Sequence, residues 1–138
     1  MAVSNKYLSY HFESGFWISA TGTIYKEDKK GNLIRVKQTR DQGHNGGAYL
    51  RVYSSKSKKR YYSHRLVAMA FVANLDPKFR TEVNHKNMNV WDNNYSNLEW
   101  LTPKENRQHA RDFDKSKLSL GYRYDKEFKK WVFLDNEK

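Results

Sequence analysis

A polar stretch between Glu82 and Ala110 constrains the fold of this chain more than any other feature. It contains two short apolar segments, Glu82–His85 and Leu98–Leu101, whose length is typical of strands. A long loop crowded with Asn separates them. The stretch therefore predicts a compact unit of strand, loop and strand.

A helix is predicted directly after the second of these segments. Thr102 and Glu105 form a capping box, and the proline between them suits the first helical position. Asn106 then falls near the end of the first turn, and His109 follows three residues later on the same face. The complete unit can place His85 and Asn106 opposite each other.

The N-terminal half is predicted to be an antiparallel β-meander, because turn signals separate its β-rich segments. Gly22 can supply positive φ in the first turn, and residues 41–47 are expected to form a flexible loop. Residues 1–10 have little pattern. Ser63 is expected to cap a short helix that ends at about Val72.

The C-terminal part is predicted to contain a helix over Pro103–Asp112, a polar linker over Asp114–Ser119 and a final hairpin. The expected class is therefore α+β. We divide the chain into a β-rich module at 1–62, the strand–loop–strand–helix unit at 63–113 and an appended hairpin at 114–138.

Positive charge dominates the chain and is unevenly distributed. Lys and Arg number 26 against 15 Asp and Glu, giving a formal net charge of +11. Between Lys26 and Arg65 there are 12 basic and three acidic residues, a local net charge of +9. So local an excess favours a polyanionic partner such as a nucleic acid.

Cysteine is absent, which excludes disulfides and zinc sites with thiolate ligands. No run is long and apolar enough to predict a membrane span, and the N-terminus lacks the apolar core of a signal peptide. We therefore expect no membrane partner and a cytoplasmic, intracellular location. The ten Tyr, seven Phe and four Trp allow a small chain to bury a core.

The order of His85, Asn97 and Asn106 resembles the HNH nuclease motif, which has a ββα-metal fold. The surrounding sequence is similar to HNH homing endonucleases of phages and group I introns. The similar segments are His64–Ala68, Asn84–Lys86 and Asn97–Trp100. The resemblance implies a DNA endonuclease, of the homing type or free-standing in a phage, with a nuclease unit that follows a β-rich DNA-contacting module.

The resemblance also implies roles for individual residues. His85 would be the general base, a role that suits imidazole near neutral pH. Asn97 would steady the loop and help to orient His85, and we group these two as catalytic. Asn84 and Asn106 would hold a divalent metal. Oxygen ligands without thiolate favour Mg²⁺, with Mn²⁺ as the next choice.

Two positions depart from the family pattern. Asn84 stands where many relatives have Asp, which removes a full negative charge from the expected metal site. Met88 stands where many have Gly for a tight turn, so we expect Asn87 or Asn89 to take the left-handed conformation instead. Either departure fits an alternative function, a DNA-binding protein that descends from such a nuclease and no longer cuts.

Duplex DNA is the expected partner, bound by a monomer or a homodimer. A basic protein associated with RNA or the ribosome fits the charge but leaves the order of Asn and His unexplained. His64 and His109 are secondary candidates for the site. Trp91 and Trp100 are expected in the core, and Glu99 receives no chemical role. The expected DNA-binding residues are Arg35, Lys37, Arg40, Arg51, Lys56, Lys58, Lys59 and Arg60.

Overall fold

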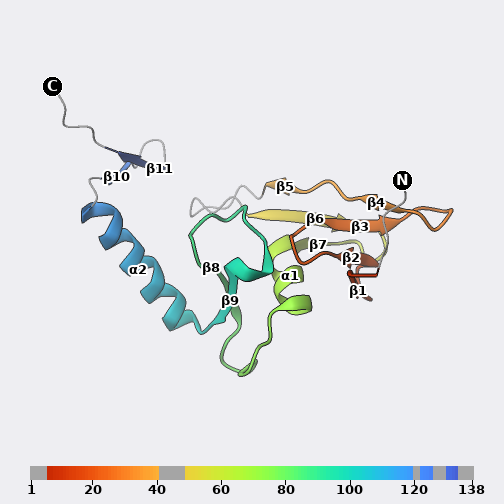
Figure 1. Cartoon of the computed structure of the whole chain (residues 1–138), viewed down its shortest axis with the longest axis horizontal. Coiled ribbons are helices and arrows are strands. Elements are labelled where there is room, and N and C mark those ends of the chain that lie inside the picture. Colours follow the sequence, from red (N-terminus) through yellow and green to blue (C-terminus); the bar gives the residue numbers. More distant parts are fainter. Residues whose placement is uncertain (1–5, 41–48, 120–121, 126–129, 134–138) are drawn as a thin grey trace.

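A computed structural model of the chain describes residues 6–40, 49–119, 122–125 and 130–133, with side chains up to Asp112. Two small antiparallel sheets lie at one end, and a strand pair followed by a long helix lies at the other (Figure 1). A short helix fills the space between them. The α+β class is therefore confirmed.

The first sheet has the order β1-β2-β3-β4, so each strand pairs with its neighbour in sequence. Positive φ at Gly22 (99°) and Gly31 (81°) allows the tight turns after β2 and β3. Strand β1 was not expected, because residues 1–10 carry little pattern. The strands are β1 (Ser9–His11), β2 (Phe16–Ile18), β3 (Ile24–Glu27) and β4 (Leu33–Arg35).

The second sheet has the order β5-β6-β7, with strands Thr39–Arg40, Leu50–Ser54 and Lys59–Tyr62. The N-terminal half is thus two successive antiparallel sheets. The loop expected at 41–47 lies outside the described residues. Helix α1 (Ser63–Phe71) follows directly, with Tyr62 at the N-cap position and no side-chain cap. The capping role expected for Ser63 is wrong, because this residue already lies inside the helix and its hydroxyl is buried.

Strand β8 (Glu82–His85) pairs antiparallel with β9 (Leu98–Leu101), with Asn84 opposite Glu99 and His85 opposite Leu98. A 3₁₀ turn, η1 (Tyr95–Asn97), closes the loop between them. Both strands have the predicted bounds. We call Glu82–Ser119, which also includes the following helix, the β8–α2 unit.

Helix α2 (Pro103–Ser119) begins with the predicted capping box. The N–H of Thr102 donates to Glu105 Oε1 (2.9 Å), and the N–H of Glu105 donates to Thr102 Oγ1 (3.1 Å). The linker expected at Asp114–Ser119 is wrong. That segment contains neither Gly nor Pro to stop a helix, so α2 continues through it.

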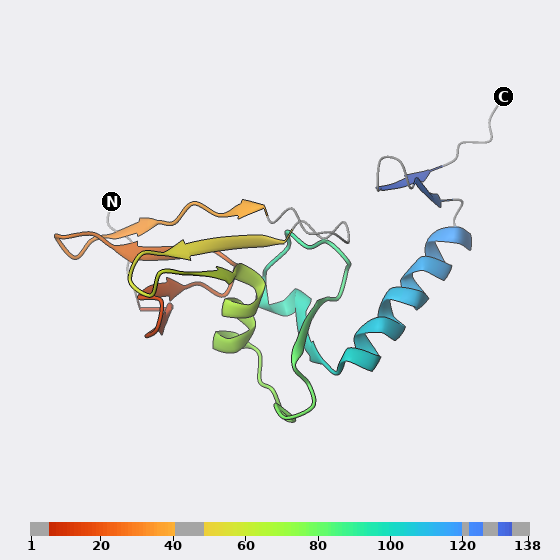
Figure 2. The ribbon, with the colours of Figure 1, turned by 180° about the vertical axis from the view of Figure 1, so that it is seen from behind.

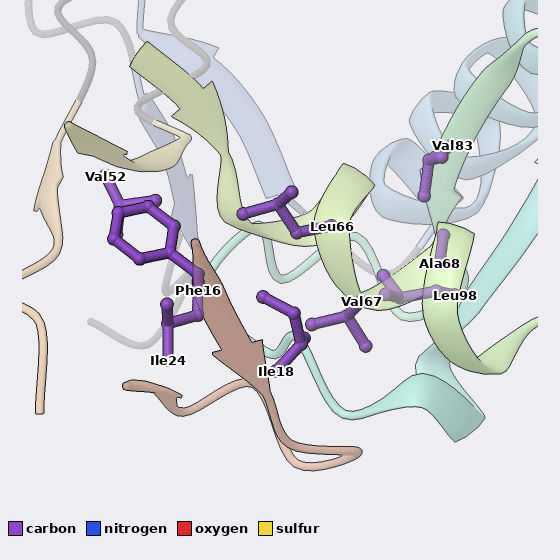
Figure 3. Close-up of a cluster of buried hydrophobic side chains, with 9 residues drawn as sticks. All are labelled: Phe16, Ile18, Ile24, Val52, Leu66, Val67, Ala68, Val83 and Leu98. Atoms are coloured by element: carbon purple, nitrogen blue, oxygen red, sulfur yellow. The ribbon is translucent and has the colours of Figure 1, made fainter. Parts of the chain in front are cut away.

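One hydrophobic core joins the N-terminal sheets to the β8–α2 unit. Helix α1 contributes Leu66, Val67 and Ala68, which pack between the two parts (Figure 3). The sheets and the strand pair are therefore held in a fixed relation. The remaining core residues are Phe16, Ile18, Ile24, Val52, Val83 and Leu98.

Helix α2 extends away from this core and leads to the predicted hairpin of β10 (Tyr122–Asp125) and β11 (Lys130–Phe133) (Figure 2). These two strands pair antiparallel, from Tyr122 opposite Phe133 to Asp125 opposite Lys130. Among the described residues, no helix combines the length and the apolar character that crossing a membrane requires.

Candidate active site

A pocket of about 240 Å³ lies where β8, the following loop and α2 meet. It brings together three of the residues that the sequence predicts, Asn84, His85 and Asn106. Asn84 and His85 are adjacent in a strand, where side chains normally alternate between faces. His85 is however the last residue of β8, and the chain turns there as the N–H of Met88 donates to the carbonyl of His85 (3.0 Å). The remaining lining residues are Tyr49, Val83, Met88, Val90, Arg107 and Ala110.

Asn93, in the loop between β8 and β9, holds the ring of His85. The Nε2 atom of His85 lies 2.7 Å from Asn93 Oδ1, in a buried hydrogen bond. An amide oxygen can only accept, so Nε2 carries the proton and Nδ1 keeps its lone pair. This contact defines the tautomer in which Nδ1 can accept a proton from water.

Two aromatic side chains fix the plane of the His85 ring. Tyr49 lies nearly parallel to both His85 and His64, with ring centroids 6.0 Å and 4.9 Å away. The two imidazole centroids are 5.0 Å apart. Tyr49 directly precedes β6 and His64 belongs to α1, so residues before the β8–α2 unit form part of the wall behind His85.

Burial lowers the pKa of both histidines. For His85 burial is the main cause, and the hydrogen bond with Asn93 and the charge of Asp92 act in the opposite direction. For His64 burial, followed by the charges of His85 and Arg65, lowers the pKa to about 3. Both rings are therefore neutral near neutral pH, which is the state that a general base needs.

The orientation of two amides tests whether the pocket fits a hard cation. Nδ2 of Asn84 donates to Glu99 Oε2, and Nδ2 of Asn106 donates to Glu82 Oε1, both at 2.8 Å. Each amide nitrogen is thus held by a carboxylate, which leaves the carbonyl oxygen for the pocket. Amide oxygens are ligands that Mg²⁺ accepts. The residues therefore fit such a cation, through donors that carry no net charge themselves.

No group of three or more His, Cys, Asp or Glu side chains that could hold a metal is found in the described part of the chain. The carboxylates nearest to the two amides are Glu82 and Glu99, which hold the amide nitrogens. Any cation held here would rely on the amide oxygens and on oxygens that a substrate supplies.

Asn97 holds the loop and makes no described contact with the ring of His85. Its Oδ1 accepts from the N–H of Asn87 (3.1 Å), and its Nδ2 donates to Asn87 Oδ1 (3.0 Å) and to the carbonyl of Asp92 (2.9 Å). Asp92 directly precedes Asn93. Asn97 can therefore orient His85 indirectly, by placing the residue that bonds the ring.

Met88 itself takes the left-handed conformation, with a φ of 65°. The expectation that Asn87 or Asn89 would do so is wrong. Asn87 instead stabilises the turn through its side chain. Its Oδ1 accepts from the N–H of Asn89 (2.8 Å) and from Nδ2 of Asn97. The backbone strain of the turn therefore falls on a residue with a long side chain.

His64 lies against His85, whereas His109 lies partly buried on α2 and does not line the pocket. Trp100 packs against the core, and its indole N–H donates to the carbonyl of Val72 (3.1 Å). The expectation that Trp91 belongs to the core is wrong, because 48% of this side chain is exposed.

The predicted DNA-binding residues fall into two groups. Arg35, Lys37 and Arg40 lie near the β8–β9 loop, and the guanidinium of Arg40 stacks 4.2 Å above the ring of Trp91. Around the β6–β7 turn, Lys56 Nζ donates to the carbonyl of Phe12 and Lys59 Nζ pairs with Glu13. Lys58 lies in that turn and Arg60 on β7, both exposed, while Arg51 is half-buried on β6.

Sequence reasoning missed several residues around the pocket. Glu99 could have been found from strand register, because a residue pairs with the one opposite it in a hairpin. Asn93 is one of many Asn in its loop, and nothing in the pattern distinguishes it. Tyr49 and Arg107 carried no signal, since only tertiary packing brings Tyr49 to a pocket formed by residues 83–110.

The region around the pocket is similar to known proteins. Residues 61–108 match the HNH endonuclease family. An uncharacterized HNH endonuclease of Acanthamoeba polyphaga mimivirus is 46% identical over 74 residues, which cover 49% of this chain and 18% of the relative. A Bacillus subtilis protein, named as the SPbeta prophage-derived HNH homing endonuclease YosQ, is 35% identical over 98 residues, covering 71% of this chain and 53% of the relative.

The fold is similar to a solved structure of the HNH homing endonuclease I-HmuI, which describes DNA binding and cleavage by that protein. The TM-score is 0.58 at 27% identity, over 75% of this chain and 57% of I-HmuI. The chain thus spans between about a fifth and just over half of the length of these relatives.

Proposed function

Because residues 61–108 of this chain match the HNH endonuclease family, we propose that the protein is a metal-dependent endonuclease that hydrolyses phosphodiester bonds of duplex DNA. The observation that carries the proposal is the pocket where His85, Asn84 and Asn106 meet. Members of this family generally use a divalent metal. The net charge of +11 suits a DNA partner, bound inside the cell by a monomer or a homodimer.

His85 is the proposed general base. Asn93 holds Nε2, which leaves Nδ1 to take a proton from the attacking water. Tyr49 and His64 hold the plane of the ring. Asn97 places the loop that carries Asn93. In this proposal the four residues keep one imidazole neutral, oriented and close to the substrate.

Asn84 and Asn106 are the proposed holders of the divalent cation, with Mg²⁺ as the first choice and Mn²⁺ as the second. When bound, such an ion supplies positive charge that lowers the barrier to attack on the phosphate. Glu99 and Glu82 keep the two amides turned so that their oxygens are available.

A catalytically inactive DNA-binding protein is the second candidate. It is favoured by the neutral donors at Asn84 and Asn106, since a carboxylate would hold the cation more tightly. The two functions differ in what happens to DNA at saturating protein. Nicked or linear plasmid with Mg²⁺ or Mn²⁺ supports the nuclease, and a gel shift without product supports the binder.

The decisive variant is His85→Ala. Loss of a general base costs on the order of 10²–10⁴ in rate, whereas one neutral side chain adds little to phosphate binding. Cleavage should therefore be abolished while the gel-shift affinity stays close to that of the wild type. Wild-type cleavage by this variant, shown by circular dichroism to be folded, would remove His85 from the mechanism.

A further inference from the structure

One side chain that lines the pocket carries a full positive charge at neutral pH, and it belongs to Arg107. Three others, Asn84, His85 and Asn106, are neutral polar groups already placed in the proposed mechanism. The rest of the described lining is the phenol of Tyr49 and a set of apolar side chains. That apolar set is Val83, Met88, Val90 and Ala110.

The first turns of α2 hold Arg107 at this wall. The capping box of Thr102 and Glu105 fixes the start of the helix. Asn106, directly before Arg107, is tied to β8 through Glu82. Ala110 lines the same pocket one turn further along. The backbone that carries Arg107 is therefore fixed relative to His85.

Arg107 is an exposed residue, and within the described part of the chain its side chain makes no hydrogen bond or ion pair. Arg111, one turn later on the same helix, differs from Arg107 in its hydrogen bonding and in its position relative to the pocket. Its Nη2 donates to Gln108 Oε1 (2.8 Å), and it does not line the pocket. The two arginines thus form a natural pair for comparison.

The substrate supplies the reason for a cation at this point. A phosphodiester carries a negative charge, and more charge collects on its oxygens as water attacks. The donors Asn84 and Asn106 are neutral, and Glu82 and Glu99 lie behind them. None of the eight basic residues predicted to bind DNA lines this pocket, since they lie on or between the strands of the N-terminal sheets.

We propose that Arg107 is a further catalytic residue, whose guanidinium binds the non-bridging oxygens of the scissile phosphate. This role rests on the proposed nuclease function. The oxygen of water bonds to phosphorus while one ester bond breaks, the proton of water goes to His85, and the leaving oxygen takes a proton from solvent. Arg107 exchanges no atom. It stabilises the charge that develops on the phosphate.

Arginine suits this role better than lysine would. Its planar fork donates two parallel hydrogen bonds to a phosphate, whereas an ammonium group acts as a single point charge. Arg107→Lys should therefore recover only part of the activity that Arg107→Gln loses.

The test compares Arg107→Gln, Arg107→Lys and the control Arg111→Gln on one oligonucleotide duplex that the wild-type protein cuts. Single-turnover rates and dissociation constants are measured at fixed Mg²⁺ and ionic strength. Loss of one donor to a developing oxyanion costs about 10²–10³ in rate, so Arg107→Gln should slow by that order. Its dissociation constant should rise by no more than about fivefold, as expected for one exposed ion pair. Arg111→Gln should cut at the wild-type rate.

Chemical rescue separates a direct contact from a structural role. Guanidinium chloride, added below denaturing concentrations with NaCl lowered to match, should raise the rate of Arg107→Ala and leave that of Arg111→Ala unchanged. The role of Arg107 is overturned by a wild-type rate in Arg107→Gln, by a loss confined to affinity, or by absence of rescue. A wild-type protein that binds DNA and never cuts it would instead remove the nuclease function, and this catalytic role with it.

Discussion

Among single residues, His64 couples the stability of the chain to pH. Its pKa is held at about 3 when folded, against an ordinary value of 6.5, so the unfolded chain takes up a proton first as pH falls. Stability is therefore full above pH 6.5 and decreases through the window down to about 3, at up to about 1.4 kcal/mol per pH unit.

His64→Phe should flatten this dependence, because it keeps a ring against Tyr49 and removes the titrating group. The measurement is urea unfolding of both proteins at about pH 7 and about pH 5, where the wild type should lose more stability than the variant. His85, whose pKa is also lowered, remains in both proteins. Equal losses would show that His64 does not stay neutral in the fold.

Asn84 decides how strongly the proposed metal site binds its ion. Asn84→Asp adds a carboxylate and removes the hydrogen bond that Asn84 now donates to Glu99. Two carboxylates then face each other, so the variant should be less stable without metal and should regain stability with it. The Mg²⁺ concentration for half-maximal cleavage should fall.

Asn89→Asp is the matched control, because it adds the same charge in the loop that follows β8, outside the pocket. A Mg²⁺ titration of cleavage and of thermal stability is made for both variants and the wild type at fixed ionic strength. An equal shift of the Mg²⁺ concentration at the midpoint in Asn84→Asp and Asn89→Asp would mean that the added negative charge acts only through the electrostatic potential around the pocket, and that Asn84 does not hold the ion.

At the scale of elements, the turn between β2 and β3 supports the loop that carries Asn93. Gly22 has a φ of 99°, and a Cβ placed there would lie 3.0 Å from Asn93 Cβ and 3.2 Å from Asn93 O. The carbonyl of Ala20 also accepts from the N–H of Tyr95 (2.8 Å). The N-terminal sheet therefore positions His85 through Asn93.

Gly22→Ala should consequently lower both stability and the cleavage rate. Gly31→Ala is the control, since Gly31 has a similar φ of 81° in the turn after β3 but nothing within 4 Å of its Cβ position. Backbone strain should cost each variant about 1–2 kcal/mol in chemical unfolding. Only Gly22→Ala should slow single-turnover cleavage. A rate equal to that of Gly31→Ala would mean that the turn does not position Asn93.

Over the whole molecule, the two groups of cations should contribute unequally to DNA affinity. Arg35, Lys37 and Arg40 lie beside the β8–β9 loop, whereas Lys59 is already paired with Glu13. Removing one cation that neutralises a DNA phosphate lowers the slope of log affinity against log salt by about one unit. A cation that already has a protein partner releases fewer counterions when it meets DNA.

Replacing Arg35, Lys37 and Arg40 by Gln should therefore flatten the salt dependence more, per charge removed, than replacing the β6–β7 group. That second group is Lys56, Lys58, Lys59 and Arg60. The measurement is gel-shift affinity over a range of NaCl concentrations. The opposite ranking would place the DNA along the far end of the sheets.

Local structure was predictable from sequence. The capping box at Thr102, the bounds of β8 and β9 and the turn at Gly22 each depend on residues close in sequence, so their patterns are visible in the chain. The resemblance of the sequence around His85 to HNH nucleases also indicated that Asn84, His85 and Asn106 meet in one pocket. Helix boundaries were less predictable. Ser63 is a residue type that often caps a helix, but the structure places it inside α1.

Tertiary structure alone decided what surrounds His85. Contacts across the shared core decide which of the many Asn side chains hydrogen-bonds to the ring. They also bring Tyr49, the residue directly before β6, onto the ring and Arg107 to the same pocket. Such contacts form because burying one continuous apolar surface fixes the sheets, α1 and the β8–α2 unit relative to each other. Contacts between residues so far apart in the chain produce no periodic pattern in the sequence, so they could not be predicted from it.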